Sequence, residues 1–408
     1  MSQFDRAGID VAIVGAGPAG TAAAVTLARA GRRVVVVDKA DFPRDKCCGD
    51  GLTTGALRLL DDLGLDPTTI PSWQRIDDVV VRGPRARQVT FPLPRGRGTF
   101  AAVARRTEFD AALVDLARRN GAQVCTGHAL TGATRHADRV TLDIDGIGRI
   151  DVPWVIGADG MWSPLRRALG ERLDGYRGDW HAFRQYIGNV SPPATEELMI
   201  WFDADLLPGY AWSFPLADGR VNFGFGIIRG AHLDGAAMSR RWDDLLSRPH
   251  IRGFLGAAAE PEGQRKAWPI PTRLPGPSLT AGRALFVGDA AALGDPMTGE
   301  GIGQALASGI AAAQAVTAHP EVPTAVEAAY RAWVGSHLAP DTRMANLLSR
   351  ALKHRKGARA AIATAGLTPW TRRNFVRWLF EDEPRGVLFT PGRLHARFLR
   401  RDGAFVED

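Results

Sequence analysis

The sequence predicts an α/β fold into which a second, antiparallel-sheet domain is inserted, with a helical region at the C-terminus. Short apolar runs at 11–14, 34–37, 154–156 and 284–287 read as the buried strands of a parallel sheet, and alanine-rich helical segments follow at 21–30 and 304–317. The block 180–228 is rich in strand residues and shows no helical period. This change of pattern within one chain indicates two kinds of sheet.

Composition fits a large globular protein. The chain has 408 residues, of which 45% are hydrophobic and 23% charged, enough for two or three interleaved domains. The first ten residues lack a signal pattern, and no apolar stretch of about 18 residues lies outside the first glycine motif. Three cysteines do not make a disulfide framework. We therefore expect a cytoplasmic protein.

The positive charge is concentrated near the C-terminus. Residues 340–408 contain 14 Lys and Arg against seven Asp and Glu, which accounts for the whole net charge of +7. A basic segment beside a neutral body favours an anionic membrane surface or an acidic substrate group. The alternative is a solvated helical face in an arginine-rich chain. Nucleic acid is not expected, because no binding motif accompanies the charge.

The N-terminal segment carries a complete dinucleotide-binding pattern. Gly15-Ala16-Gly17-Pro18-Ala19-Gly20 follows the first apolar strand and opens a helix, and the second strand ends in Asp38. Gly15 makes the tight turn, Gly17 allows a pyrophosphate to approach the backbone, and Gly20 allows close packing of helix and strand. The helix N-terminus attracts phosphate, and an acid at Asp38 suits a ribose. The pattern predicts a Rossmann-type unit.

The other elements follow in order along the chain. We expect helices at 54–63, 106–120 and 242–246, a helix start at 163–164, a hairpin of 75–82 with 88–93, strands at 99–104 and 122–125, a meander over 129–155, and strands at 181–190, 197–202, 210–215 and 220–228. Residues after 321 read as helical and basic. The nucleotide domain would comprise 1–70, 104–170 and 281–320, the substrate domain 71–103 and 171–280, and the C-terminal region 321–408.

Two later loops repeat the arrangement of strand, glycine, carboxylate and helix. They are Gly157-Ala158-Asp159-Gly160 and Gly288-Asp289 with Gly299-Glu300-Gly301-Ile302-Gly303. Loops after parallel strands gather at the carboxyl edge of the sheet, where ligands bind. Asp289 could hold a ribitol or ribose hydroxyl, and the glycines near 301 free backbone N–H groups for a pyrophosphate or a reduced flavin. Arg106 could neutralise a phosphate.

Together these three loops resemble the signatures of flavoproteins with the para-hydroxybenzoate hydroxylase fold. Two further segments are similar to the geranylgeranyl reductase family, which includes menaquinone and digeranylgeranylglycerophospholipid reductases. Pro43 to Gly51 contains Lys46-Cys47-Cys48-Gly49-Asp50-Gly51, where the family has Lys-Pro-Cys-Gly-x-Gly. Tyr210-Ala211-Trp212-Ser213-Phe214-Pro215 with Gly224-Phe225-Gly226 resembles its Tyr-x-Trp-x-Phe-Pro and Gly-x-Gly element. The resemblance covers about residues 8–320.

The resemblance implies FAD as cofactor and assigns roles by position. Cys48 falls at the family's cysteine near the flavin, and Cys47 departs from the family's proline. Tyr210 and Trp212 would line the cavity for an alkene, and a Cys or Tyr could supply the proton that accompanies a hydride. We predict that FAD binds to Gly15, Gly17, Ala19, Gly20, Asp38, Lys39, Cys48, Gly49, Arg106, Asp159, Gly160, Gly288, Asp289, Gly299, Gly301 and Ile302. No metal site is expected.

The function favoured by these residues is FAD-dependent saturation of carbon–carbon double bonds in an isoprenoid lipid, quinone or terpenoid. Electrons would come from an external donor, namely NADPH, ferredoxin or a reductase, because no second glycine motif for NADPH is present. A flavin monooxygenase is the main alternative, since the fold serves both. A halogenase fits less well, because its Trp-x-Trp-x-Ile-Pro element is not matched. A non-catalytic electron relay is the remaining class.

Overall fold

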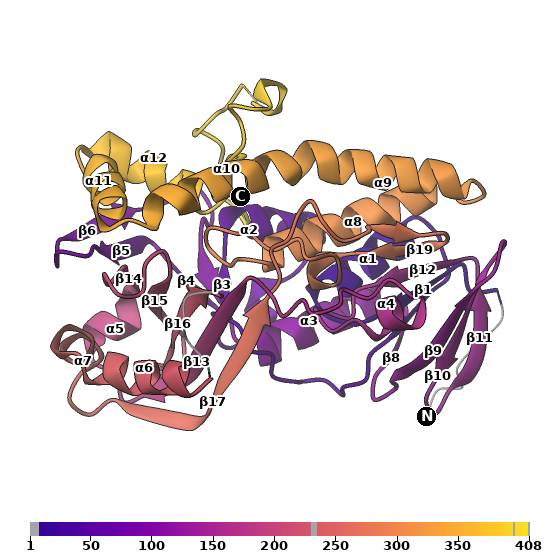
Figure 1. The fold of residues 1–408 in the computed structure, drawn as a ribbon, viewed down its shortest axis with the longest axis horizontal. Coiled ribbons are helices and arrows are strands. Elements are labelled where there is room, and N and C mark those ends of the chain that lie inside the picture. Colours follow the sequence, from indigo (N-terminus) through magenta and orange to yellow (C-terminus); the bar gives the residue numbers. More distant parts are fainter. Residues whose placement is uncertain (1–7, 230–234, 395, 407–408) are drawn as a thin grey trace.

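A six-stranded sheet organises one half of the computed structural model, which describes residues 8–229, 235–394 and 396–406 (Figure 1). Its order is β18-β19-β12-β1-β2-β8, and every neighbouring pair is parallel except β18 with β19. The strands span Thr280–Ala281, Ala284–Phe286, Trp154–Gly157, Val11–Val14, Val34–Val37 and Gln123–Cys125. The apolar runs predicted from the sequence are these buried strands.

Helices from distant parts of the chain pack beside this sheet. They are α1 (Pro18–Arg29), α2 (Thr54–Asp62), α3 (Arg106–Arg119), α4 (Pro164–Ala168) and α8 (Ile302–Ala318). Helices α1 and α8 approach closely at Gly309. A Cβ there would lie 2.1 Å from the Ala19 carbonyl oxygen, so a larger residue would not fit. The expected meander is β9 (Leu130–Arg135), β10 (Val140–Ile144) and β11 (Gly148–Val152), at the right-hand end in Figure 1.

A seven-stranded sheet forms the second half, in the order β17-β13-β16-β15-β14-β5-β6. Its strands span Glu260–Ile270, Trp180–Gly188, Val221–Ile228, Tyr210–Pro215, Leu198–Trp201, Asp78–Arg82 and Gln88–Pro92. It is antiparallel, as predicted, apart from the parallel pair of β14 with β5. A small sheet consists of β3 (Gly51–Leu52), β7 (Ala102–Val103) and β4 (Gln74–Arg75). The strand expected at 99–104 is thus shorter, and the one expected at 75–82 is divided between β4 and β5.

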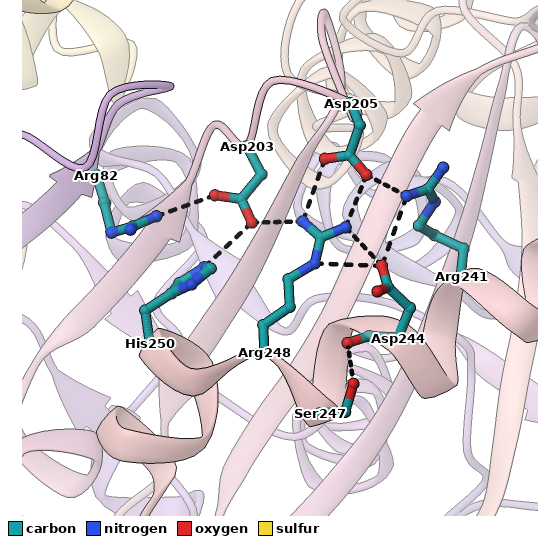
Figure 2. A network of polar contacts seen from close by, with 8 residues as sticks. All are labelled: Arg82, Asp203, Asp205, Arg241, Asp244, Ser247, Arg248 and His250. Carbon is teal, nitrogen blue, oxygen red and sulfur yellow. Dashed lines mark hydrogen bonds and ion pairs between the residues drawn. The ribbon is translucent and has the colours of Figure 1, made fainter.

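Three helices cover one region of the seven-stranded sheet: α5 (Pro192–Glu196), α6 (Gly235–Ser247) and α7 (Pro249–Leu255). A polar network fastens α6 and α7 to the segment between β14 and β15 (Figure 2). The Asp203 carboxylate accepts hydrogen bonds from Arg82 at 3.1 Å and from Arg248 at 2.6 Å, and lies 3.1 Å from His250 Nε2. Because Asp203 is 7% exposed, these contacts fix the segment that leads into β15.

The C-terminal region is helical, as the sequence predicts, with α9 (Pro323–His337), α10 (Ala339–Leu352), α11 (Arg355–Ala365) and α12 (Pro369–Leu379). Helix α12 packs on the edge strand β6, where the rings of Phe91 and Phe375 lie 5.3 Å apart. This contact packs α12 against the side chains of the outermost strand of the sheet. Within the described ranges no helix is long and apolar enough to cross a bilayer. The domain bounds given above stay a prediction.

Candidate functional site

A cavity of about 970 Å³ opens between the two sheets. This volume lies near the upper end of the range for ligand pockets, roughly 300–1,000 Å³. The three glycine loops form one part of its wall, and strands β13, β15 and β17 with the 44–51 loop form the other. Every residue predicted to bind FAD or substrate lines this cavity except Gly20 and Gly288. The fold therefore brings residues that are far apart in the sequence, from Gly15 to Ile302, to the wall of one cavity.

The first loop leaves room for a phosphate group. Gly15 has φ +104°, and a Cβ there would lie 2.3 Å from the Ala158 carbonyl oxygen. A Cβ at Gly20 would lie 1.8 Å from the Gly15 carbonyl oxygen, so Gly20 serves packing behind the wall. Gly17 caps α1, and a Cβ there would meet only Arg44 Nη2, at 3.7 Å. The open backbone at a helix N-terminus fits a pyrophosphate.

Two carboxylates face the cavity from the ends of β2 and β12. Asp38 accepts hydrogen bonds from the Ala16 N–H at 2.8 Å and the Ala40 N–H at 2.9 Å, beside the exposed Lys39 at the rim. Asp159, next to Gly160, accepts one from the Leu165 N–H at 2.9 Å. Its other oxygen is buried and has no partner among the residues that the structure describes, and burial raises the pKa of Asp159 to about 6. An orphaned buried acceptor fits a hydroxyl donor of a cofactor.

The third loop brings the N-terminus of α8 to the cavity. Gly301 caps this helix, and Gly299, Ile302 and Asp289 line the wall beside it. Gly288 lies behind them and donates its N–H to Ser308 Oγ at 3.0 Å. The Glu300 carboxylate accepts the Ile302 N–H at 2.9 Å, and burial with the charge of Glu381 raises the pKa of Glu300 to about 7. Sequence reasoning did not assign Glu300 a role.

Arg106 lines the cavity, but its charge is already balanced. Arg106 is 6% exposed, and its guanidinium pairs with both oxygens of Asp110, at 2.7 and 2.8 Å. Arg44 also contacts Asp110, at 3.0 Å, and lies beside Gly17. The phosphate contact predicted for Arg106 stays a prediction, and Arg44 is a second cation, beside the first loop. The spacing of Arg106 and Asp110 by four residues on a helix was the sequence signal for their pairing.

The cysteine loop places its two thiols in different surroundings. Cys48 Sγ accepts the Asp50 N–H at 3.3 Å, whereas Cys47 Sγ donates to the Lys266 carbonyl at 3.5 Å. Burial raises the pKa of Cys48 to about 11, against the opposing effect of Arg106, and that of Cys47 to about 12. Both are therefore thiols at neutral pH. Cys48 therefore keeps its proton at the cavity wall, and its role as a proton donor stays a prediction.

Tyr210 and Trp212 face the cavity from alternate positions of β15, with ring centroids 5.9 Å apart. The Tyr210 hydroxyl donates to the Thr298 carbonyl, and Trp212 Nε1 donates to Asn222 Oδ1 at 3.1 Å. Burial raises the pKa of Tyr210. Gly224 pairs with Trp212 in the neighbouring strand, and a Cβ there would lie 2.3 Å from the indole. The paired glycines and aromatics of the motif therefore fit each other sterically.

A polar layer behind the cysteine loop was missed by the sequence analysis. The Asp50 carboxylate accepts hydrogen bonds from Tyr186 Oη at 2.7 Å and from Asn222 Nδ2 at 2.8 Å. Asn222 Nδ2 also donates to the Cys48 carbonyl at 2.8 Å. Tyr186 and Asn222 are polar residues inside strands β13 and β16. Their polar character inside strands was the available sequence signal, but it does not show which groups their side chains contact.

Comparison with known proteins agrees with this geometry. Residues 8–319 match the family model described as FAD binding domain. Menaquinone reductase of Mycobacterium tuberculosis is 36% identical over 340 residues, which cover 77% of each chain. Digeranylgeranylglycerophospholipid reductase 1 of Methanopyrus kandleri is 31% identical over 328 residues, covering 77% of this chain and 82% of that one. This chain belongs to the geranylgeranyl reductase family of FAD-dependent oxidoreductases.

Solved structures show the same fold across that family and beyond it. A geranylgeranyl bacteriochlorophyll reductase-like protein of Thermoplasma acidophilum has a TM-score of 0.77 and 22% identity, covering 94% of this chain and 99% of that one. A halogenase in complex with FAD has a TM-score of 0.71 and 17% identity, covering 96% and 85%. At these identities the likeness shows the fold alone. The reductase family is supported by the more similar sequences.

Proposed function

We propose that this protein saturates carbon–carbon double bonds of a prenyl chain. The observation that carries the proposal is the position of the Cys48 thiol. It lies in the same cavity as the three glycine loops and the Tyr210 and Trp212 wall. Reduced FAD bound to these loops would supply the hydride. The reductases named above, similar over three quarters of the chain, support the same substrate class.

The chain's own groups would bind the alkene and hold the proton. The Trp180, Tyr210, Trp212, Phe214, Trp268 and Ile270 side chains supply an apolar wall that excludes water from a prenyl chain. Cys48 keeps its proton at neutral pH because of its high pKa. A positioned thiol can release that proton when the alkene carbon gains electron density. The Tyr210 hydroxyl, which donates to the Thr298 carbonyl, would position the wall.

Two partners complete the proposal. The first is an external electron donor, either NADPH, ferredoxin or a reductase. The second is an anionic membrane surface, contacted by the C-terminal region. Nine of the ten large hydrophobic side chains that are exposed in the described part of the chain lie after residue 321, including Trp370, Leu388 and Phe389. Exposed aromatic and apolar groups beside a net positive charge suit an interface that holds a lipid substrate.

The test is product mass under strict control of oxygen. FAD-loaded protein is reduced with dithionite and incubated with menaquinone, geranylgeranyl diphosphate or digeranylgeranylglycerophospholipid. Saturation without air, with two hydrogens gained per double bond, is the expected result. Gain of one oxygen atom that needs air would instead show a monooxygenase, and flavin reoxidation with unchanged lipid would show an electron relay.

The proton role of Cys48 is tested by Cys48→Ala. We expect flavin binding to persist, because the glycine loops are untouched, and saturation to fall by about a hundredfold or more, the usual range for loss of a general acid. Cys47→Ala is the matched control and should retain activity, since its thiol hydrogen bonds the Lys266 carbonyl instead. Equal activity of the two variants would contradict the role of Cys48. The flavin absorbance spectrum reports binding in both.

A further inference from the structure

An unusual acid lies directly behind the cysteine loop. Asp50 is 0% exposed and has φ +66°, in the left-handed region. Its N–H donates to Cys48 Sγ, and its Oδ2 receives the bonds from Tyr186 and Asn222. Its Oδ1 is buried and, in the part of the chain that the structure describes, has no hydrogen-bond partner.

Anchoring the loop does not explain why this residue is an acid. Asparagine adopts positive φ readily and would accept the same two hydrogen bonds at one oxygen. Burying a carboxylate with one unsatisfied oxygen costs free energy. A carboxylate that takes up and releases a proton needs such a free oxygen, because the proton binds there. The Asp50 N–H bond to Cys48 Sγ, at 3.3 Å, places the acid next to the thiol, and the charge of Asp50 raises the pKa of Cys48.

Tyr186 connects Asp50 to the molecular surface. Its hydroxyl donates to Asp50 at 2.7 Å, and its ring is partly exposed on β13. The Arg184 and Arg105 guanidinium groups lie 4.4 and 5.0 Å from the ring centroid. The charged and titratable groups facing Asp50 are thus Tyr186 and Arg184 of the substrate sheet, Arg106 of α3, and Cys48 of its own loop. Hydrogen bonds thus join the partly exposed Tyr186 to the Asp50 carboxylate, and the Asp50 backbone N–H to the Cys48 thiol.

We propose that Asp50 reloads Cys48 with a proton after each reduction, with Tyr186 as the link to solvent. The inference rests on the proposed function. In each cycle the alkene takes one hydride from the reduced cofactor and one proton from the Cys48 S–H bond. Asp50 then gives its proton to the thiolate. The Asp50 carboxylate regains a proton through the Tyr186 hydroxyl, which passes its own proton inward as its oxygen takes one from solvent, so that no tyrosinate forms. Electrons enter from the external reductant.

The acidities of the two groups favour this direction. Burial raises the pKa of Asp50 to about 6, while that of Cys48 is raised to about 11. A Cys48 thiolate is therefore a much stronger base than an Asp50 carboxylate, and transfer from the acid to the thiolate is downhill. Asp50 itself stays within reach of protonation from water near neutral pH. Asp50 is thus a positioning residue that acts through Cys48.

The first turnover can be separated from later ones. Wild type and Asp50→Asn, both loaded with FAD, are reduced by one equivalent of dithionite without air and mixed with menaquinone. In this single turnover Cys48 already carries its proton, so both proteins should saturate one bond per flavin at rates within about twofold. With excess dithionite, Asp50→Asn should slow about tenfold to a hundredfold after the first product, because the thiolate is reloaded slowly. Tyr186→Phe should show the same pattern.

The matched control is Tyr176→Phe. Its hydroxyl also donates to a carboxylate, Asp179, but outside this route. Equal rates of Asp50→Asn and wild type in both regimes, or an equal loss in both, would overturn the relay. Cys48→Ala is run beside them. If Cys48→Ala fails in the first turnover while Asp50→Asn is normal throughout, only the relay is wrong. If Cys48→Ala is active, the donor role is wrong, and no saturation by wild type would count against the proposed function.

Discussion

At the scale of single residues, Glu300 carries a pH dependence that can be measured. Its pKa in the fold is about 7, above the ordinary value of 4.5, mainly because of burial. The folded protein therefore binds this proton more tightly than the unfolded chain. The resulting stability is fully present below about pH 4.5 and is lost as the pH rises through about 7.

Glu300→Gln should remove this loss. In protein stripped of FAD, we expect the variant to be about 1–3 kcal/mol more stable than wild type at about pH 8 and equal to it at about pH 4. Gln keeps an oxygen that can accept the Ile302 N–H. Urea unfolding at the two pH values measures the difference. Exposed Glu196→Gln is the control, and a gain for Glu300→Gln that is the same at both pH values would contradict the prediction.

The sequence predicted motif residues better than their partners. Gly15, Gly17, Asp159 and Gly301, which line the cavity, could be singled out because a cofactor needs bare backbone and acids at fixed places in a strand–loop–helix unit. Asp50 occupies the variable position of the cysteine motif, and its partners come from strands more than 130 residues away. No local pattern reports such a contact. It depends on the register of β13 and β16 against a loop.

At the scale of elements, the network around Asp203 holds the segment that leads into β15. Three side chains contact this one carboxylate (Figure 2). Arg82 belongs to β5, Arg248 lies between α6 and α7, and His250 belongs to α7. The ring of Phe202, next to Asp203, lies 5.7 Å from that of Tyr210. The network therefore supports the aromatic wall of the cavity from behind.

Asp203→Asn should weaken both stability and activity. Removing the charge leaves the Arg82 guanidinium without its ion-pair partner, whereas Arg248 keeps Asp205 and Asp244. The loss should cost about 1–3 kcal/mol of unfolding free energy. Denaturant unfolding and the menaquinone assay measure the two effects. Asp244→Asn is the control from the same network, because its side chain is 50% exposed and such pairs contribute about 0–1 kcal/mol. Equal losses of stability in both variants would show that Asp203 contributes no more to the fold than Asp244.

Helices and strands could be predicted where the hydrophobic pattern of the sequence matches the burial of the side chains in the structure. The valine run of β2 and the helix of α3 lie within a residue of their expected bounds. Strand β17 was missed because its first eight residues, Glu260 to Ala267, are exposed and mostly polar, so no alternation marks it. The parallel pairing of β14 with β5 also has no local signal. It joins segments over 100 residues apart, and their order depends on the whole sheet.

At the scale of the whole molecule, acidic side chains of the C-terminal region form ion pairs, whereas several of its basic side chains face solvent. Its acids pair within the fold: Asp382 with Arg58 and Arg377, Asp341 with Arg393, and Asp402 with Arg97. Exposed bases such as Arg343 and Arg350 of α10 have no ion pair within the described ranges. These two arginines line a groove of about 490 Å³ with Asn346, Leu347 and Phe389. The segment after α12 stands out beside α10 in Figure 1.

This sorting predicts selective binding to anionic bilayers. FAD-loaded protein should co-sediment with vesicles that contain phosphatidylglycerol, bind little to phosphatidylcholine alone, and detach as salt is raised, because screening weakens surface charges. The double variant Arg343→Gln with Arg350→Gln should bind about thirtyfold more weakly, at about 1 kcal/mol for each charge near the surface. Trp370→Ala should weaken binding in a way that salt does not reproduce, because it removes an apolar contact.

The charge-matched control is Arg118→Gln with Arg119→Gln, at the exposed end of α3. Both double variants lower the net charge by two, so a non-specific attraction would weaken equally in each. Loss of binding confined to the α10 variant places the contact on the C-terminal region. Saturation of menaquinone in detergent should then be unchanged in that variant, while saturation in anionic vesicles falls, since the cavity is intact and only delivery of the lipid is impaired. Equal weakening of the two double variants would contradict a specific membrane face.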